Sequence, residues 1–336
     1  MTDPLLRVED LTIQYETSSG PVTAASGVSF DLRPGEFLGL AGESGAGKST
    51  VAKSIIGGLE SNGSVVDGRI IFDGRELQSL SEQEFNEVIR WKEIAWIPQG
   101  SMNSLDPLRT IGAQAIEIAD VHTDLTDEEA LDRFKEAFEI VGLQPNRVTE
   151  YPHQFSGGMQ QRAIIALALF LEPSLIIADE PTTALDVIMQ DQIFKYLNQI
   201  KPTGNTSMLL ITHDISLIFE SCEQIVLMHA GQVAERGNVI EVNNNPRHPY
   251  TRLLKRAFPD IRYPERDLAV IKGHPPRNFG EVTQCTFVDR CPWGIDACRD
   301  GEPELLPASN GDADHVVGCI RAEELDEVAI EEGIGQ

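Results

Sequence analysis

Residues 42–49 form a glycine-rich segment whose spacing suits phosphate binding. They fit the pattern G-x-x-x-x-G-K-[ST] and lie between an apolar strand pattern, Glu36–Ala41, and a helical pattern that runs to about Leu59. Glycines allow backbone N–H groups to curl around a phosphate, and the N-terminus of the following helix adds a favourable dipole. Lys48 would reach the β- and γ-phosphates, and the Ser49 hydroxyl would ligate Mg²⁺. The residues expected to contact a nucleotide are Gly42, Ser44, Gly45, Gly47, Lys48, Ser49 and Thr50.

Two acidic residues follow a second apolar strand pattern. Residues Leu175–Ala178 are all apolar, as in a strand that is buried on both faces of a parallel sheet, and Asp179 and Glu180 come directly after them. Asp179 suits the Mg²⁺ shell, whereas Glu180 suits the positioning and deprotonation of an attacking water. Two adjacent acids alone would more often be a solvated turn. Their place after a buried strand, downstream of the glycine loop, favours a role in hydrolysis.

A further candidate anion site lies at the start of another helical pattern. Residues 155–161 read FSGGMQQ and precede an apolar helical stretch. Ser156 offers a hydroxyl, and the two glycines after it offer backbone N–H groups at a helix N-terminus. Ser-Gly-Gly alone is more often only a loop, so its interpretation depends on the other motifs.

The elements that must position these motifs alternate between strands and helices. Leu5–Tyr15 and Val22–Asp31, separated by a polar turn, indicate a strand–turn–strand unit. Residues from about 105 to 170 are mostly helical in pattern, and Ser207–Thr212 is a further apolar strand. A strand, a glycine loop and a helix in this order form half of a parallel α/β unit. Pro, Gly and Cys become denser beyond Pro259, which indicates a separate C-terminal module.

The order of these motifs resembles that of the ATP-binding-cassette (ABC) ATPases, with residues 155–161 in the place of the signature loop. Four more positions match the family: Gln99 the Q-loop, Asp186 the D-loop, His213 the switch histidine, and Tyr15 the aromatic ring that stacks on adenine. The resemblance implies an α/β fold with a RecA-like parallel sheet, an antiparallel β subdomain and a helical subdomain, followed by a small cysteine-containing module.

The resemblance also implies how the motifs cooperate. Two subunits would sandwich ATP between the phosphate loop of one and Ser156 and Gly158 of the other. Glu180 would orient the attacking water, and His213 would contact the γ-phosphate. The implied Mg²⁺ ligands are Ser49, Gln99 and Asp179.

Three further stretches resemble the ATP-binding subunits of di- and oligopeptide importers: Tyr151–Phe155, Asp179–Val187 and His248–Leu254. The last is the most discriminating, because it lies outside the nucleotide chemistry. Gln160 and Lys272 depart from the family pattern. Relatives with this layout also import nickel or oligosaccharides, and these substrates remain alternatives.

The resemblance to this family implies a division of the chain and a set of partners. Residues 1–258 would form the ABC domain, with a helical subdomain at about 100–172, and residues 259–336 a C-terminal extension with an acidic tail. The implied partners are a homologous second ATPase subunit in a heterodimer, two membrane permeases and an extracytoplasmic solute-binding protein. The implied location is peripheral, on the cytoplasmic face of the cell membrane.

Four of the five cysteines cluster near the C-terminus, as C-x5-C-x6-C-x20-C at Cys285, Cys291, Cys298 and Cys319. Structural disulfides are not expected in a reducing compartment, so four thiolates could instead hold Zn²⁺ or an iron–sulfur cluster. The spacing lacks the C-x2-C pairs of common zinc ribbons. Resemblance to some peptide-importer ATPases favours a [4Fe–4S] cluster, with zinc or no metal as alternatives.

Charge and composition exclude several other functions. The chain has 27 basic and 53 acidic residues, for a net charge of −26, which opposes binding to nucleic acids. No signal peptide is expected from the first residues, and the longest apolar run, Ala163–Leu171, is far short of the roughly 20 residues of a membrane span. A soluble ABC ATPase of DNA repair or translation is less consistent with one cassette and this charge. A small-molecule kinase would explain neither the signature loop nor His213.

Overall fold

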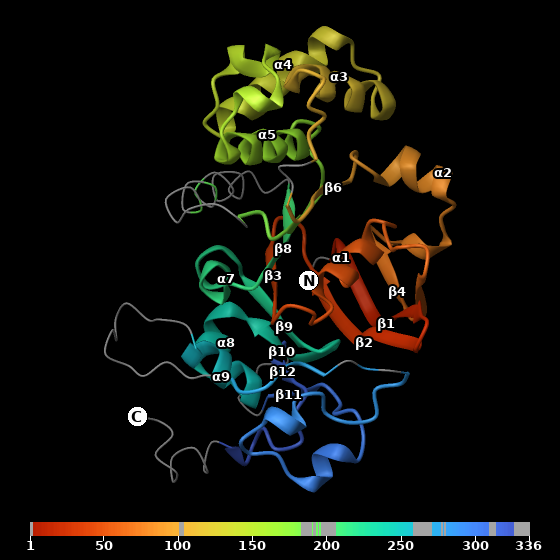
Figure 1. The fold of residues 1–336 in the computed structure, drawn as a ribbon, viewed down its shortest axis with the longest axis vertical. Helices are drawn as coiled ribbons and strands as arrows, with labels where there is room; N and C mark the ends of the chain where they lie inside the picture. Colours follow the sequence, from red (N-terminus) through yellow and green to blue (C-terminus); the bar gives the residue numbers. More distant parts are fainter. Residues whose placement is uncertain are drawn as a thin grey trace. The chain divides into compact units, whose positions relative to one another are not determined.

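The computed structural model describes most of the chain (Figure 1). The described residues are 3–100, 104–182, 190, 193, 195, 206–257, 271–276, 278, 280–308 and 314–325. They belong to two units whose segments alternate along the chain. The first unit contains Met1–Leu6, Leu32–Phe37 and Phe72–Ile211, and the second contains Arg7–Asp31, Leu38–Ile71 and Thr212–Gln336.

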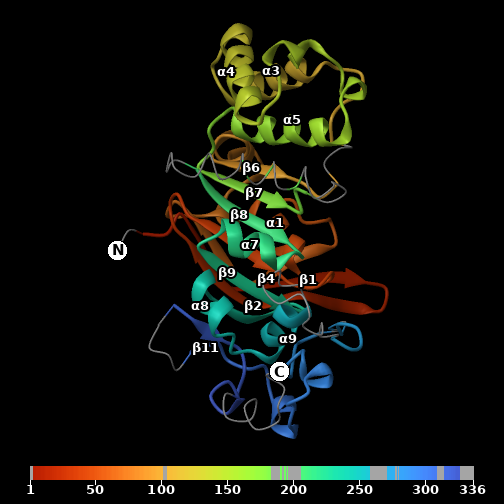
Figure 2. The same cartoon turned by 90° about the vertical axis from the view of Figure 1, so that its left-hand side faces the viewer.

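Three parallel strands lie side by side in the first unit (Figure 2). They are β6 (Ile94–Ile97), β7 (Leu175–Asp179) and β8 (Ser207–Thr212). β7 is central, with Ile176 opposite Ala95 on one side and Met208 on the other. Every residue of β7 and β8 is buried, which explains why both segments are continuous apolar runs. The strand predictions for these two segments are confirmed.

The first unit also contains the helices expected between residues 105 and 170. They are α3 (Ile111–His122), α4 (Asp127–Ile140) and α5 (Gly157–Leu169), and smaller elements precede them: β5 (Arg75–Glu76), α2 (Glu82–Glu84) and a π-helical turn at Phe85–Ile89. A capping box between Thr126 and Glu129 begins α4. α4 packs on both α3 and α5 around four phenylalanines, Phe134, Phe138, Phe155 and Phe170.

The second unit contains two groups of strands. In the first group, β1 (Leu6–Thr17) lies between β2 (Gly20–Leu32) and β4 (Gly63–Phe72). A two-residue turn joins β1 to β2, as expected from the strand–turn–strand pattern. In the second group, the neighbours in order are β3 (Phe37–Ala41), β9 (Gln224–His229), β10 (Gln232–Asn238), β12 (Val316–Val317) and β11 (Leu306–Pro307). β3 and β9 are parallel and the others antiparallel, so C-terminal residues extend the sheet beyond β10.

Among the described residues, four α-helices accompany these strands: α1 (Lys48–Ile55), α7 (Ile215–Ser221), α8 (Val239–Asn244) and α9 (Pro249–Ala257). The sequence pattern predicts that α1 runs to about Leu59, which is wrong. The helix ends at Ile55 because Gly57 adopts a φ of 64°, in the left-handed region that terminates helices.

A buried polar cluster connects β10 to the chain before α9. The Glu235 carboxylate accepts hydrogen bonds from the backbone N–H groups of Arg247 (2.8 Å) and His248 (2.9 Å). His315 Nε2 lies 2.7 Å from the same carboxylate, and both side chains are fully buried. A buried carboxylate is tolerated only when its oxygens are satisfied in this way. Glu235 therefore fixes the start of the His248–Leu254 segment that resembles peptide importers.

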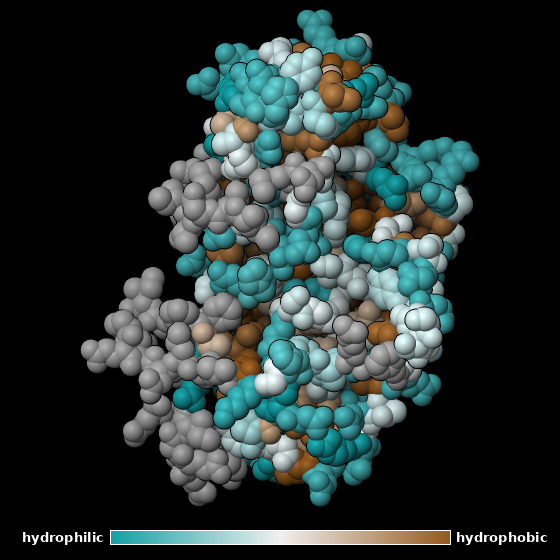
Figure 3. All heavy atoms as spheres, viewed as in Figure 1, coloured by the Kyte–Doolittle hydropathy of each residue, from teal (hydrophilic) through white to brown (hydrophobic). Residues whose placement is uncertain are grey.

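On the face shown in Figure 3, hydrophilic side chains cover much of the described surface, which agrees with the excess of acidic residues. Among the described helices, none combines the length and apolar character that crossing a membrane requires.

Candidate functional site

The glycine loop lies between β3 and α1, as the sequence predicts, and its close packing explains two of its glycines. A Cβ atom at Gly42 would come within 2.2 Å of the Met228 carbonyl oxygen, and one at Gly47 within 2.1 Å of that of Ala24. Gly47 also has a φ of 96° and forms the N-cap of α1. Any side chain at either position would therefore push the loop away from β9 or β2.

Lys48 is held by the loop itself. Its side chain is buried, and Nζ donates to the carbonyl oxygens of Gly42 (2.8 Å) and Glu43 (3.0 Å). Ser44 and Gly45 are exposed at the tip, while Ser49 and Thr50 lie in the first turn of α1. The ammonium group thus lies beside the backbone that would surround a phosphate, where a charged hydrogen-bond donor is most useful.

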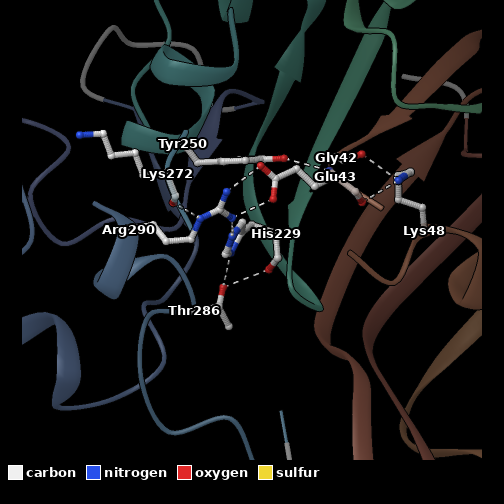
Figure 4. Close-up of polar contacts among 8 residues, drawn as sticks. All are labelled: Gly42, Glu43, Lys48, His229, Tyr250, Lys272, Thr286 and Arg290. Atoms are coloured by element: carbon white, nitrogen blue, oxygen red, sulfur yellow. Dashed lines mark hydrogen bonds and ion pairs between the residues drawn. The ribbon is translucent and has the colours of Figure 1, made fainter. Parts of the chain in front are cut away.

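Glu43, at a variable position of the loop motif, is bound on every side (Figure 4). Its carboxylate accepts two hydrogen bonds from Arg290, Nη1 at 2.7 Å and Nη2 at 2.9 Å. Its backbone N–H donates to the Tyr250 hydroxyl at 3.0 Å, and its carbonyl accepts from Lys48. No sequence motif singles out Glu43 or Arg290, and Tyr250 stands out only as part of the His248–Leu254 family motif.

His229, at the end of β9, supports Arg290 from the other side. Burial, with a smaller contribution from the Arg290 charge, lowers the pKa of His229 to about 4, so the imidazole is neutral near pH 7. Its Nε2 lies 2.9 Å from Arg290 Nη1, and its Nδ1 lies 3.0 Å from the Thr286 hydroxyl, which also donates to the His229 carbonyl. Both ring nitrogens form hydrogen bonds if Nδ1 carries the proton and donates to Thr286, and Nε2 accepts from Arg290.

In the first unit, the acidic pair lies at the carboxyl end of β7. Asp179 is the last, buried residue of this strand. Glu180 follows with a φ of 47°, an unfavourable conformation for a non-glycine residue, and its backbone N–H donates to Ile211 at 2.8 Å. Its carboxylate accepts a hydrogen bond from Gln99 Nε2 at 2.8 Å. The structure therefore brings together two residues that the sequence predicts to act on the attacking water and Mg²⁺.

The signature segment begins α5, also in the first unit. Ser156 is the exposed N-cap residue of the helix, but its side chain makes no capping hydrogen bond, and Gly157 and Gly158 form the first turn. Exposed N–H groups at a helix start favour an anion. Gln161, one turn further on, donates from its buried side chain to the carbonyl of Pro181 and so joins this helix to the turn after Glu180.

Two of the remaining predicted nucleotide contacts, Tyr15 and His213, lie near the ends of strands. The ring of Tyr15 lies over Gly63, where an added Cβ would approach to 2.6 Å, and its hydroxyl donates to Glu60 at 2.8 Å. His213 is exposed directly after β8. Asp186 lies outside the described residues.

The four clustered cysteines line one small apolar pocket together with Phe287, Val288 and Trp293. Burial raises the pKa of Cys291 to about 12 and that of Cys319 to about 11, so these are neutral thiols unless a cation displaces their protons. Among the described residues, no three His, Cys, Asp or Glu side chains are close enough to hold one metal ion. The fifth cysteine, Cys222, is buried as a small core residue, as expected.

A phosphate loop, a strand that ends in two acids and a Ser-Gly-Gly helix start define the ATPase cassette of ABC transporters. Two family descriptions match this chain: "ABC transporter" over residues 25–183 and "Oligopeptide/dipeptide transporter, C-terminal region" over residues 234–298.

Relatives that match over most of their length narrow the class from ABC transporter ATPases in general to those of peptide transporters. The chain is 39% identical to the probable peptide ABC transporter ATP-binding protein y4tR of Sinorhizobium fredii, over 96% of both chains. It is 40% identical to the oligopeptide transport ATP-binding protein OppD of Escherichia coli, over 90% of this chain and 89% of the relative. A solved dimer of the ATP-binding cassette MJ0796 with ADP and Pi has a TM-score of 0.63 at 27% identity, and the match covers 70% of this chain and 98% of that one. The chain belongs to the family of peptide ABC transporter ATP-binding proteins.

Proposed function

We propose that this chain hydrolyses ATP to drive the import of di- or oligopeptides across a cell membrane. The observation that carries the hydrolytic role is the 2.8 Å hydrogen bond between Gln99 and Glu180 at the carboxyl ends of β6 and β7. The peptide substrate is supported by two relatives named for peptide transport that match about 90% or more of this chain. Nickel and oligosaccharides remain alternative substrates.

The roles proposed for individual residues follow from their positions. Glu180 is the general base for water, with His213 at the γ-phosphate. Ser49, Gln99 and Asp179 have the oxygen ligands that Mg²⁺ prefers. Tyr15 would stack on adenine, and Lys48 would bind the β- and γ-phosphates. Ser156, Gly158 and Asp186 would act on the nucleotide held by the partner subunit.

The proposed assembly contains a second, homologous ATPase subunit, two permease subunits and an extracytoplasmic solute-binding protein. The ATPase would lie on the cytoplasmic face of the membrane. Residues 1–258 would form the ATP-binding domain, with a helical subdomain at about 100–172, and residues 259–336 the C-terminal extension.

Uptake into vesicles tests the substrate. The chain would be co-purified with its permeases, reconstituted in liposomes with the binding protein and ATP, and offered labelled tetrapeptide, maltotetraose or Ni²⁺ in turn. We expect ATP-dependent accumulation of the peptide alone. Accumulation of the sugar or the metal without the peptide would contradict the proposed substrate and leave the ATPase assignment intact.

We further propose that Cys285, Cys291, Cys298 and Cys319 hold a [4Fe–4S] cluster. Four thiols that line one apolar pocket fit the ligand set of such clusters. The cavity that they line with Phe287, Val288 and Trp293 measures about 20 Å³, so its lining must rearrange to accept a cluster. Cys298 lies on a single-turn 3-10 helix, Asp296–Arg299, and Cys291 directly follows another, Val288–Arg290, and such short elements can shift. When bound, the cluster would cross-link this module.

Anaerobic purification and metal analysis test the cluster. We expect about four iron and four sulfide atoms per chain, with a broad absorption band in the violet–blue, from a four-cysteine cluster. Cys291→Ser should lose most of the iron, while Cys222→Ala, which alters a cysteine outside the module, should keep it. Zinc, or a folded protein without metal, would contradict the proposal.

A further inference from the structure

We infer that Arg290 is a positioning residue for ATP binding, which couples the four-cysteine module to the phosphate loop through Glu43. This inference rests on the role of the loop in binding ATP. It depends neither on the transported solute nor on the metal.

The contact between Arg290 and Glu43 is rigid on the side of the four-cysteine module, because hydrogen bonds fix the arginine. All three guanidinium nitrogens of Arg290 have partners: Nη1 and Nη2 bind the Glu43 carboxylate, Nη1 also meets His229, and Nε donates to the carbonyl of Lys272 at 3.0 Å. The side chain is only 6% exposed. Arg290 also directly precedes Cys291, one of the four pocket cysteines. A movement of this cysteine therefore moves the arginine.

On the side of the phosphate loop, Glu43 connects Arg290 directly to the backbone around Lys48. Arg290 holds the Glu43 carboxylate, and the Tyr250 hydroxyl accepts from the Glu43 N–H, which fixes the peptide plane that also carries the Gly42 carbonyl. The carbonyls of Gly42 and Glu43 are the two acceptors for Lys48 Nζ. Arg290 thus sets the backbone against which the phosphate-binding lysine rests, and bidentate pairing is a geometry that lysine cannot reproduce.

The Arg290–Glu43 pair also sets the net charge of the phosphate loop. Glu43 places a carboxylate in a loop that must receive a polyphosphate anion. Arg290 neutralises that carboxylate at 2.7 and 2.9 Å, in a partly buried setting where salt screens poorly. Without the arginine, an unpaired negative charge would oppose ATP, and the fixed orientation of the loop would be lost. Both effects weaken nucleotide binding.

Nucleotide affinity of the purified full-length chain provides the first test, with Mg²⁺ and a fluorescent ATP analogue as the probe. We expect Arg290→Met to weaken binding about tenfold, within the usual range of coupling between sites, and Arg290→Lys to recover part of the loss. Arg299→Met is the matched control, because this arginine of the same module pairs with Asp289 on the exposed surface. The control should bind like wild type.

A double-variant cycle separates coupling from general damage to the fold. Glu43→Gln keeps the size of the side chain and removes its charge. In the Glu43→Gln background, Arg290→Met should have little further effect on affinity, because the carboxylate that it neutralises is gone. If the two losses multiply, or if folded Arg290→Met and Arg290→Lys both bind ATP like wild type, the inference is wrong. Since Glu43→Gln changes no residue of the module, the cycle remains informative with Arg290→Lys if Arg290→Met does not fold.

Coupling between two sites is reciprocal, so ATP binding at the phosphate loop should also stabilise the four-cysteine module. Hydrogen exchange of residues 285–299 should slow when Mg-ATP binds wild-type protein or Arg299→Met, and should not slow in Arg290→Lys at equal saturation. In the assembled transporter, Arg290→Lys should raise the KM for ATP more than it lowers kcat, as expected when uniform binding is lost. Equal protection in Arg290→Lys and wild type would overturn the coupling.

Discussion

Glu180→Gln should leave ATP binding intact and reduce ATP turnover by about 100- to 10,000-fold, the usual contribution of a general base. The amide has the shape of the carboxylate and can still accept a hydrogen bond from Gln99 through its oxygen, but it cannot take a proton from water. Steady-state phosphate release measures the rate, and gel filtration with ATP should show a trapped dimer, because hydrolysis no longer separates the subunits.

The control for this variant is Glu172→Gln. Glu172 is also a glutamate with a positive φ, 53°, in the same unit, but it is exposed before β7 and away from the acidic pair. The Glu172→Gln variant should hydrolyse ATP at the wild-type rate. Normal turnover in Glu180→Gln would show that another group activates the water.

Lys48→Met should reduce ATP affinity by about 100-fold. Nζ now rests on two carbonyl oxygens, and bound phosphates would take their place as stronger, charged acceptors. Hydrogen bonds to charged groups contribute about 1.5–3 kcal/mol each, and 2.7 kcal/mol corresponds to about 100-fold in affinity. Methionine keeps the length of the buried stem, so circular dichroism should still show a folded protein, although the melting temperature falls because two carbonyl oxygens lose their donor.

Titration with a fluorescent ATP analogue measures this loss. Lys135→Met is the matched control, since this lysine is exposed on α4 and pairs with Asp132 at 2.7 Å. Wild-type affinity in Lys48→Met would refute the phosphate-binding role of the lysine. Equal weakening in both variants would point to a general effect of charge.

Features that depend on neighbouring residues were predictable from the sequence. The glycine loop follows β3 and begins α1 because its spacing encodes that turn. β7 ends at Asp179 because an apolar run long enough for one strand stops there. The sequence pattern places the end of α1 four residues too late, since the helical pattern continues past Gly57, where the backbone turns left-handed.

Features that depend on distant residues were not predictable. Nothing local to Glu43 or Arg290 indicates that they pair, because one occupies a variable motif position and the other resembles any surface arginine. Tyr250 stands out in the sequence only as part of the His248–Leu254 family motif, although its hydroxyl meets the loop backbone. Glu235 and His315 form their buried contact across 80 positions of sequence. Only the folded chain brings such residues together.

The distance in sequence between Glu43 and Arg290 has a consequence for synthesis. The two residues are 247 positions apart. At translation rates of about 5–20 residues per second, Glu43 is made roughly 12–50 s before its arginine. During that interval the nascent chain has a phosphate loop with an unpaired Glu43. Since the pair cannot exist earlier, this loop reaches its final form only after residue 290 has been translated.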